Sequence, residues 1–276
     1  MAIEKSNNPD TFLEFERTGW GNSIAGYDDA FGAVSRQTVG PLLDAAHVKN
    51  GMRVLDLCCG PGMLAEGAIA RGAQAVGLDF SSVVELARCL VPEAEFHEGD
   101  AQQLPFPDNS FDAVLCGYGL MHVPDAGKVL REMLRVLRPR GRAAVSVWEK
   151  DTPNNGFGLV YVAVRSCGNL NVPLPHGADF FQFGTTEKMT EALRETGFAN
   201  IKAQLLKQDW PVRSGEQIMQ AVLKGAVRSR ALLSAQSPKE KQAIAKFFER
   251  TLDGLPKSGS NFLVPLPAII GSGAKL

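Results

Sequence analysis

The stretch that decides the fold runs from residue 53 to residue 62 and reads Arg53-Val54-Leu55-Asp56-Leu57-Cys58-Cys59-Gly60-Pro61-Gly62. Its first half is a short apolar run, which is typical of a strand buried on both faces. Its second half is a glycine-rich turn, and residues 63–71 then carry apolar side chains at helical spacing. A strand that ends in such a turn and opens a helix predicts a ligand site outside the carboxyl end of a parallel sheet.

Strand and helix patterns continue to alternate as far as Trp148. We expect strands at residues 53–57, 74–79, 95–99, 111–116 and 142–148. Apolar strands separated by helical crossovers favour a parallel sheet sandwiched by helices, and right-handed crossovers limit the topology to a doubly wound sheet. The predicted fold class is therefore α/β, with a mostly parallel sheet and helical lid insertions.

The pattern changes on both sides of this core. We expect a strand at 201–210, helices at 217–235 and 238–251, and a last strand at 261–270. The predicted organisation is an N-terminal helical cap at 1–46, a ligand-binding core at 47–150, an insertion at 151–183, and the rest of the core sheet at 184–276 with a helical lid at 215–255.

Composition excludes several classes of protein. The chain has 276 residues, 29 Lys plus Arg, 30 Asp plus Glu and a formal charge of -1, which argues against a dedicated nucleic-acid binder. Its five cysteines are odd in number and form no C-x-x-C pair, which argues against a disulfide framework or a zinc site and favours a reducing cytoplasm. Residues 1–9 contain no apolar run that could act as a signal peptide, and no stretch of 18 apolar residues occurs, so we expect neither a signal peptide nor a membrane span.

Acidic residues follow three successive predicted strands. Asp56 stands just before the glycine-rich turn, Asp79 ends the second strand, and Asp100 follows the third. Asp79 is placed to accept ribose hydroxyls, and Asp100 and the Ala101 N–H are placed to meet an adenine ring. Small residues around Gly117 then leave room at the end of the fourth strand.

Two ligand classes compete for this turn. Gly60-x-Gly62-x-x-Ala65, with Asp79 downstream, satisfies the dinucleotide fingerprint. The Asp56 carboxylate, however, repels a pyrophosphate and attracts an ammonium or sulfonium group. A charge pair about 4 Å apart is worth about 4 kcal/mol at an effective dielectric constant of about 20, so the sign of the ligand charge matters.

Several motifs together resemble the class I S-adenosylmethionine-dependent methyltransferases over about residues 35–150, most closely the ubiquinone- and menaquinone-biosynthesis-like branch that acts on small molecules. The motifs are the glycine-rich turn and the segments 78–81, 99–106, 110–112 and 137–141. The resemblance implies a seven-stranded sheet with an antiparallel last strand and a bound S-adenosylmethionine. Two positions depart from the family pattern, because Cys58 and Arg140 stand where the family has glycine.

The predicted site residues fall into two sets, and no metal ligand is among them. Those expected to bind the cofactor S-adenosylmethionine are Tyr27, Asp56, Cys58, Gly60, Gly62, Asp79, Phe80, Asp100, Ala101 and Gly117. Those expected to contact the acceptor are Trp20, Tyr118, His122, Phe180 and Phe181, with His122 as the candidate catalytic base. Aromatic faces also attract a sulfonium, which gives the N-terminal aromatic residues a physical role.

The expected function is methyl transfer, by in-line displacement, to a small and partly apolar acceptor molecule. The expected partner is this acceptor, with no nucleic acid and no membrane. Two other functions stay open, namely an NAD-dependent oxidoreductase and a non-catalytic scaffold that binds the donor.

Overall fold

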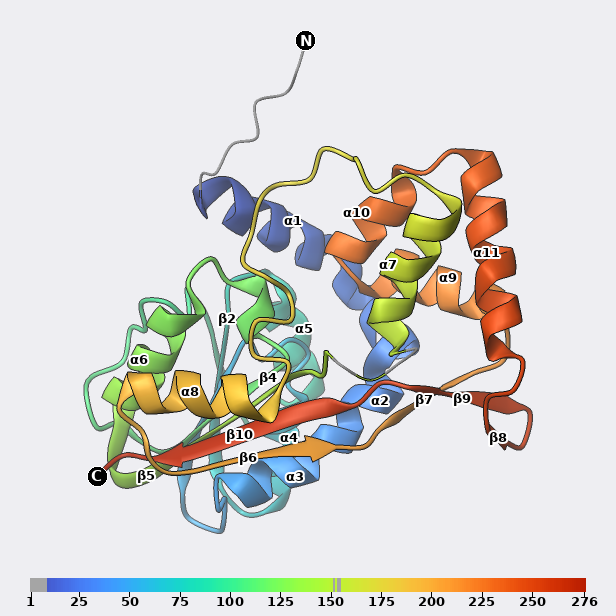
Figure 1. The fold of residues 1–276 in the computed structure, drawn as a ribbon. Helices are drawn as coiled ribbons and strands as arrows, with labels where there is room; N and C mark the ends of the chain where they lie inside the picture. The colour runs from blue at the N-terminus through green and yellow to red at the C-terminus, as the bar shows by residue number, and fades with distance from the viewer. Residues whose placement is uncertain (1–8, 151, 153–154) are drawn as a thin grey trace. The chain divides into compact units, whose positions relative to one another are not determined.

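The computed structural model describes residues 9–150, 152 and 155–276 (Figure 1). Two compact units divide the chain. The first contains residues up to Ser35 together with 150–177 and 207–267, and the second contains residues 36–149, 178–206 and 268–276.

A seven-stranded sheet is the centre of the second unit. Its strands, in spatial order, are β3 (Glu95–Glu98), β2 (Gln74–Asp79), β1 (Arg53–Leu57), β4 (Phe111–Gly117), β5 (Leu137–Trp148), β10 (Ala268–Ala274) and β6 (Ala199–Leu206). The first five are parallel, and β10 is antiparallel to both of its neighbours. The mostly parallel sheet with an antiparallel last strand is as predicted.

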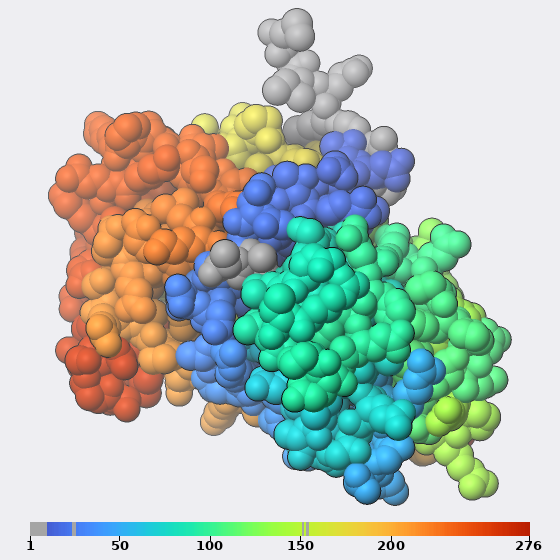
Figure 2. All heavy atoms as spheres, turned by 180° about the vertical axis from the view of Figure 1, so that it is seen from behind, coloured from blue at the N-terminus to red at the C-terminus, as the bar shows by residue number. Residues whose placement is uncertain are grey.

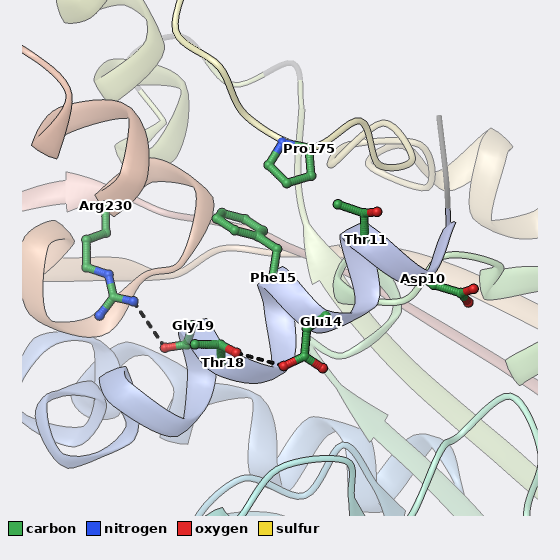
Figure 3. A pocket seen from close by; sticks show the side chains of 8 residues that line it. All are labelled: Asp10, Thr11, Glu14, Phe15, Thr18, Gly19, Pro175 and Arg230. Atoms are coloured by element: carbon green, nitrogen blue, oxygen red, sulfur yellow. Dashed lines mark hydrogen bonds between the residues drawn. The ribbon is translucent and has the colours of Figure 1, made fainter. Parts of the chain in front are cut away.

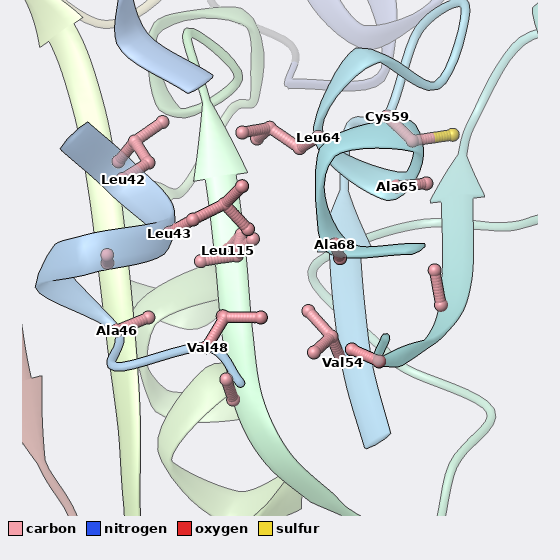
Figure 4. Packing of buried hydrophobic residues seen from close by; sticks show 14 of the residues in the cluster. Leu42, Leu43, Ala46, Val48, Val54, Cys59, Leu64, Ala65, Ala68 and Leu115 are labelled. Carbon is pink, nitrogen blue, oxygen red and sulfur yellow. The ribbon is translucent and has the colours of Figure 1, made fainter. Parts of the chain in front are cut away.

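Helices cover both faces of this sheet, and they are α3 (Val39–Ala45), α4 (Met63–Ala70), α5 (Val83–Leu90), α6 (Ala126–Val136) and α8 (Thr186–Thr196). Side chains of α3, α4 and α5 form one apolar core with the strands, and Figure 4 shows Leu42 and Leu43 of α3 across from Leu115 of β4 and Leu64 of α4. Such fully buried leucines each contribute about 1.5–3 kcal/mol. On the other side, α6 packs against α8 and β5. The segments from α4 to the turn after β3, cyan to green, form one continuous face of this unit in Figure 2.

The strand order creates a switch point between β1 and β4. From β1 the chain proceeds outward through β2 to β3, and then returns to the other side of β1 as β4. Open α/β sheets bind ligands at the carboxyl ends of the strands at such a point. The glycine-rich turn follows β1, so this topology places it at the switch point.

The first unit combines helices with a small sheet. Its elements are α1 (Pro9–Tyr27), the π-helical turn η1 (Asp28–Gly32), α2 (Ala33–Ser35), α7 (Gly156–Cys167), α9 (Gly215–Gly225), α10 (Arg228–Ser234), α11 (Pro238–Leu252), β7 (Asp209–Val212), β8 (Lys257–Ser258) and β9 (Asn261–Pro265). Phe31 packs between Phe157 and Trp210, with ring centroids 5.2 and 5.1 Å away. The Trp210 indole N–H also donates to the Ala30 carbonyl at 3.0 Å, so the N-terminal segment is anchored to β7.

Two predicted strands are wrong as single elements. The expected strand 201–210 is β6 and β7, and the expected strand 261–270 is β9 and β10, with each half in a different sheet. For the second, the break falls at Pro265-Leu266-Pro267, where proline nitrogens have no hydrogen to donate to a ladder.

The helix prediction also needs correction in the first unit. The expected helix 217–235 is interrupted between α9 and α10, where Ala226 is extended. Helix α7 was not expected within the Gly- and Asn-rich insertion. Asn155 caps it by accepting a hydrogen bond from the Phe157 N–H at 3.1 Å, and its buried apolar face stabilises it despite two glycines. Among the described residues, no helix is both long and apolar enough to cross a membrane.

Candidate functional site

The glycine-rich turn between β1 and α4 has a left-handed backbone at three positions. The φ angles are 53° at Cys58, 52° at Gly60 and 89° at Gly62. A side chain at such a φ costs about 1–2 kcal/mol, so Cys58 occupies a strained position. A Cβ placed on Gly60 would meet no atom within 4 Å. The backbone at Gly60 therefore lies beside open space, as a ligand cradle requires.

Asp56, on β1, carries a buried carboxyl group just before the glycine-rich turn. It is 1% exposed, and its Oδ2 accepts a hydrogen bond from the Ala65 N–H at 3.1 Å, in the first turn of α4. Its Oδ1 is buried and has no hydrogen-bond partner. Burial raises the pKa of Asp56 to about 8; the Ala65 bond lowers it and the Asp79 charge raises it further. The residue combines a helix cap with an acceptor that is left for a ligand.

Asp79, at the end of β2, fixes the turn. Its Oδ2 accepts from the Gly60 N–H at 3.1 Å, and its Oδ1 accepts from the Ser81 N–H at 3.0 Å and the Ser81 hydroxyl at 2.8 Å. Burial raises the pKa of Asp79, although these hydrogen bonds oppose the shift. Phe80 follows it and is half-buried. The Ser81 hydroxyl is engaged by Asp79, and α5 begins after Ser82.

Asp100 and Ala101 follow β3. The Asp100 carboxylate is half-buried, and both of its oxygens accept from the Gln102 side-chain amide at 3.1 Å. The Gln102 carbonyl oxygen in turn accepts from the Asp125 N–H at 3.0 Å. Gln102 is a supporting residue that the sequence prediction missed, since it joins Asp100 to Asp125, which lies 23 residues further along the chain.

The end of β4 is held against β5. Tyr118, just after Gly117, has a φ of 56°, which is an outlier for a bulky residue, and its N–H donates to the Ser146 carbonyl at 3.0 Å. Its ring stacks on Trp148, with centroids 3.8 Å apart and an interplanar angle of 17°. Trp148 was not among the predicted site residues. Its position at the carboxyl end of β5 is the signal that could have identified it.

Tyr118 contacts Trp148, and the other predicted acceptor residues of the second unit form a separate group of contacting rings. His122, in the 3-10 turn Leu120–His122, meets the Phe180 ring edge-on at 5.9 Å. Phe180 meets Phe181 in the same way at 5.0 Å. The structure therefore brings His122 to Phe180, although these two residues are far apart in the sequence, and Phe181 follows Phe180 directly.

The two remaining predicted residues belong to the first unit. Trp20 and Tyr27 of α1 meet edge-on with centroids 5.7 Å apart, and the Tyr27 hydroxyl is 2.7 Å from the Ser35 hydroxyl. Trp20 and Tyr27 therefore contact each other. The residues around the glycine-rich turn belong to the second unit.

An open pocket of about 650 Å³ also lies in the first unit (Figure 3). Phe15 and Pro175 face it together with Asp10 and Glu14, while the Arg230 guanidinium donates to the Gly19 carbonyl at 3.3 Å. None of the side chains predicted to bind the donor or acceptor lines this pocket. It is not the site expected from the sequence. Among the described residues, no cluster of His, Cys, Asp and Glu could hold a metal ion.

Comparisons with known proteins bear on the same segment. Residues 55–145 match a family model described as a methyltransferase domain. The demethylmenaquinone methyltransferase of Listeria welshimeri is 48% identical over 107 residues, which are 35% of this chain and 45% of that protein. The chain thus spans less than half the length of the curated relatives it matches.

Solved structures share the fold over more of the chain. A Bacillus halodurans protein solved as a candidate methyltransferase has a TM-score of 0.59 at 20% identity, covering 87% of this chain and 99% of that one. Phosphoethanolamine N-methyltransferase 2 of Haemonchus contortus, solved with S-adenosyl-L-methionine, has a TM-score of 0.58 at 20% identity, covering 96% and 60%. The predicted resemblance to the class I S-adenosylmethionine-dependent methyltransferases is therefore confirmed: residues 55–145 match their methyltransferase domain, and the seven-stranded sheet has their Rossmann-like fold.

Proposed function

We propose that this protein is an S-adenosylmethionine-dependent methyltransferase that methylates a small, planar and partly apolar acceptor of the quinone-precursor class. The observation that carries the proposal is the buried Asp56 carboxyl, whose Oδ1 has no protein partner, beside a glycine-rich turn that is open at Gly60. A cationic ligand fits these features, because an unsatisfied buried acceptor costs about 1–3 kcal/mol and gains most from a charged donor. The methyltransferase-domain match supports the same reading.

Each donor-binding residue would contact a different part of the ligand. Asp56 would face the cationic end, and Asp100 and the Ala101 N–H would face the adenine. Asp79 would face the ribose. Its Oδ1 already accepts two hydrogen bonds and its Oδ2 one, so one ribose hydroxyl fits without any rearrangement of Ser81.

The remaining predicted donor residues shape the space around the ligand. Phe80 would lie against the nucleoside, Cys58 and Gly62 would shape the turn, and Gly117 would leave room for the reacting end. Cover of the donor by Tyr27 stays a prediction from the sequence. When bound, S-adenosylmethionine supplies a methyl group on a sulfonium that is displaced in line, so the protein has chiefly to align the acceptor and exclude water.

The acceptor would lie against the aromatic side chains that follow β4 and β5. Phe180 and Phe181 offer ring faces and edges, and aromatic pairs add about 0.5–1.5 kcal/mol beyond the area they bury. Tyr118 would border the same space, and a contact of Trp20 with the acceptor stays a prediction from the sequence. His122 would remove the acceptor proton where the acceptor must lose one. The Listeria relative, which by its name methylates demethylmenaquinone, favours a quinone precursor.

The two other functions fit less well. A dinucleotide would place a pyrophosphate near the Asp56 carboxylate, which would repel it. Apart from the dinucleotide fingerprint itself, nothing supports an NAD-dependent oxidoreductase. A non-catalytic scaffold would have no need of an aromatic wall beside the donor site.

All five cysteines are free, which supports a reducing compartment such as the cytoplasm.

Calorimetry and turnover test the proposal together. S-adenosylhomocysteine and S-adenosylmethionine should bind, NAD should not, and a panel of naphthols and quinols should yield a methylated product. Asp56→Asn should weaken donor binding at least tenfold. The matched control is Asp112→Asn at the opposite end of the sheet, where Asp112 pairs with Arg138 at 2.8 Å; its donor affinity should be unchanged. Tight NAD binding without S-adenosylhomocysteine binding would overturn the proposal.

A further inference from the structure

Two thiols lie side by side beneath the glycine-rich turn. Leu57 on β1 and Cys116 on β4 are register partners in neighbouring parallel strands, and Cys58 is the next residue after Leu57. The side chains of Cys58 and Cys116 are hydrogen-bonded to each other. Neighbouring strands are about 4.8 Å apart, and the Cα atoms of a disulfide usually lie about 4.4–6.8 Å apart. Cys58 directly follows the register pair of Leu57 and Cys116, so its backbone lies near that of Cys116, as a disulfide needs.

Gly119 shows how closely the two sulfurs approach. A Cβ placed on Gly119 would lie 2.7 Å from the Cys58 Sγ, 2.7 Å from the Cys116 Sγ and 2.5 Å from the Cys58 Cβ. Both sulfur atoms thus lie close to the same position beside Gly119, and any larger residue at 119 would push them apart. The absence of a side chain there lets the thiols meet.

The other cysteines are not placed for this pairing. Cys59 has its Sγ on the other side of the turn, 3.1 Å from where a Gly77 Cβ would be, and Cys89 is exposed on α5. Cys167 belongs to the first unit.

We propose that Cys58 and Cys116 form a reversible disulfide when the protein meets a peroxide, and that this bond closes the glycine-rich turn to the methyl donor. Hydrogen peroxide oxidises one thiol to a sulfenic acid and leaves as water. The second thiol then attacks the sulfenic sulfur, forms the S–S bond and releases a second water. Two thiols lose two electrons and two protons in total, and a small thiol reductant reverses the change.

The position of Cys58 explains why the bond would affect the donor. Cys58 lies two residues before Gly60, whose N–H holds Asp79, and it already has a left-handed φ. Drawing its Sγ onto Cys116 pulls this part of the turn toward β4 and away from Asp79. The effect on donor binding rests on the proposed function, whereas formation of the bond does not.

The surroundings of the pair set its rate of reaction. The hydrogen bond with Cys116, burial and the charges of Asp79 and Cys59 all raise the pKa of the Cys58 thiol. Because the thiolate is the reacting form, we expect slow oxidation at neutral pH that becomes faster as the pH rises.

The test uses the full chain, treated with hydrogen peroxide, alkylated and digested without reductant. The expected product is a peptide pair joining Cys58 to Cys116 that has lost two hydrogen atoms. The oxidised protein should bind S-adenosylhomocysteine at least tenfold more weakly and recover with dithiothreitol. Cys116→Ala should keep the starting affinity, form no cross-link and resist peroxide. Cys89→Ser should behave like the wild type.

The outcomes separate this proposal from the proposed function. Recovery of Cys58 and Cys116 as alkylated thiols after peroxide treatment would overturn it, as would a cross-link to another cysteine. A correct cross-link with unchanged affinity would overturn its effect on the donor. Failure of the untreated protein to bind S-adenosylhomocysteine would instead refute the proposed function, and the peptide map would still decide the disulfide. If Cys116→Ala does not fold, Cys58→Gly replaces it as the variant that must lose the cross-link.

Discussion

Donor binding should be linked to the loss of a proton from Asp56. Burial raises the pKa of this carboxyl to about 8, so at pH 7 only about one tenth of the ligand-free protein has it ionised. The ammonium group that S-adenosylhomocysteine carries favours the ionised form. The affinity for S-adenosylhomocysteine should therefore rise about tenfold between pH 6 and pH 7, which is about 1.4 kcal/mol, and should level off above pH 8.

Isothermal titration calorimetry measures this linkage directly. At pH 7, about 0.9 proton should be released for each ligand bound, and the apparent enthalpy should change with the ionisation enthalpy of the buffer. Asp56→Asn should bind weakly with no pH dependence, whereas Asp112→Asn should keep the wild-type slope. A dissociation constant that stays constant from pH 6 to pH 8, with no proton released, would refute the reasoning.

Three further predictions concern stability and catalysis. The pKa of Asp56 is higher in the folded than in the unfolded protein, so its contribution to the free energy of unfolding is lost as the pH rises from about 4 to 8. Asp56→Asn should therefore raise the urea midpoint of the ligand-free protein, most clearly near pH 8. An unchanged midpoint would contradict the pKa shift. Trp148→Ala removes the ring stacked on Tyr118; we expect kcat/KM for aromatic acceptors to fall at least tenfold while S-adenosylhomocysteine affinity changes less than threefold, and equal losses in both would point to general disruption. His122→Ala should lower kcat about 100-fold for an acceptor that must lose a proton, and turnover within a few-fold of wild type would exclude His122 as the base.

The core of the fold was predictable because its signals are local. The strands β1, β2 and β4 are apolar runs bounded by glycine or turn residues, and such runs identify themselves. The failures have the opposite character. The strand predicted at 201–210 keeps an extended pattern while its two halves pair with different strands, which no local window reveals. Helix α7 is stabilised by a buried face that outweighs the poor helix propensity of Gly156 and Gly158.

The candidate site divides in the same way. The positions of Asp56 and Asp79 follow from the rule that parallel strands end at one edge of the sheet, so the sequence predicted where they lie. What each carboxyl contacts depends on register. The Gly60 N–H reaches Asp79, the Asp125 N–H reaches Gln102, and the end of β5 brings Trp148 onto Tyr118. Those contacts join distant segments, and only the folded chain specifies them.

The pKa of Asp56 changes the argument that separates the two classes of ligand. At neutral pH this carboxyl is mostly protonated in the ligand-free protein, so its repulsion of a pyrophosphate is weaker than its position in the sequence suggests. The direction in which the affinity changes with pH still distinguishes the two classes of ligand. A cation binds better as Asp56 ionises, and a diphosphate binds worse through the same interval. A charge pair about 4 Å apart contributes about 4 kcal/mol, which exceeds the roughly 1.4 kcal/mol needed to ionise Asp56 at pH 7. A cationic donor can therefore displace the proton and still gain affinity, whereas a diphosphate can accept a hydrogen bond only from the protonated carboxyl and is repelled once Asp56 ionises.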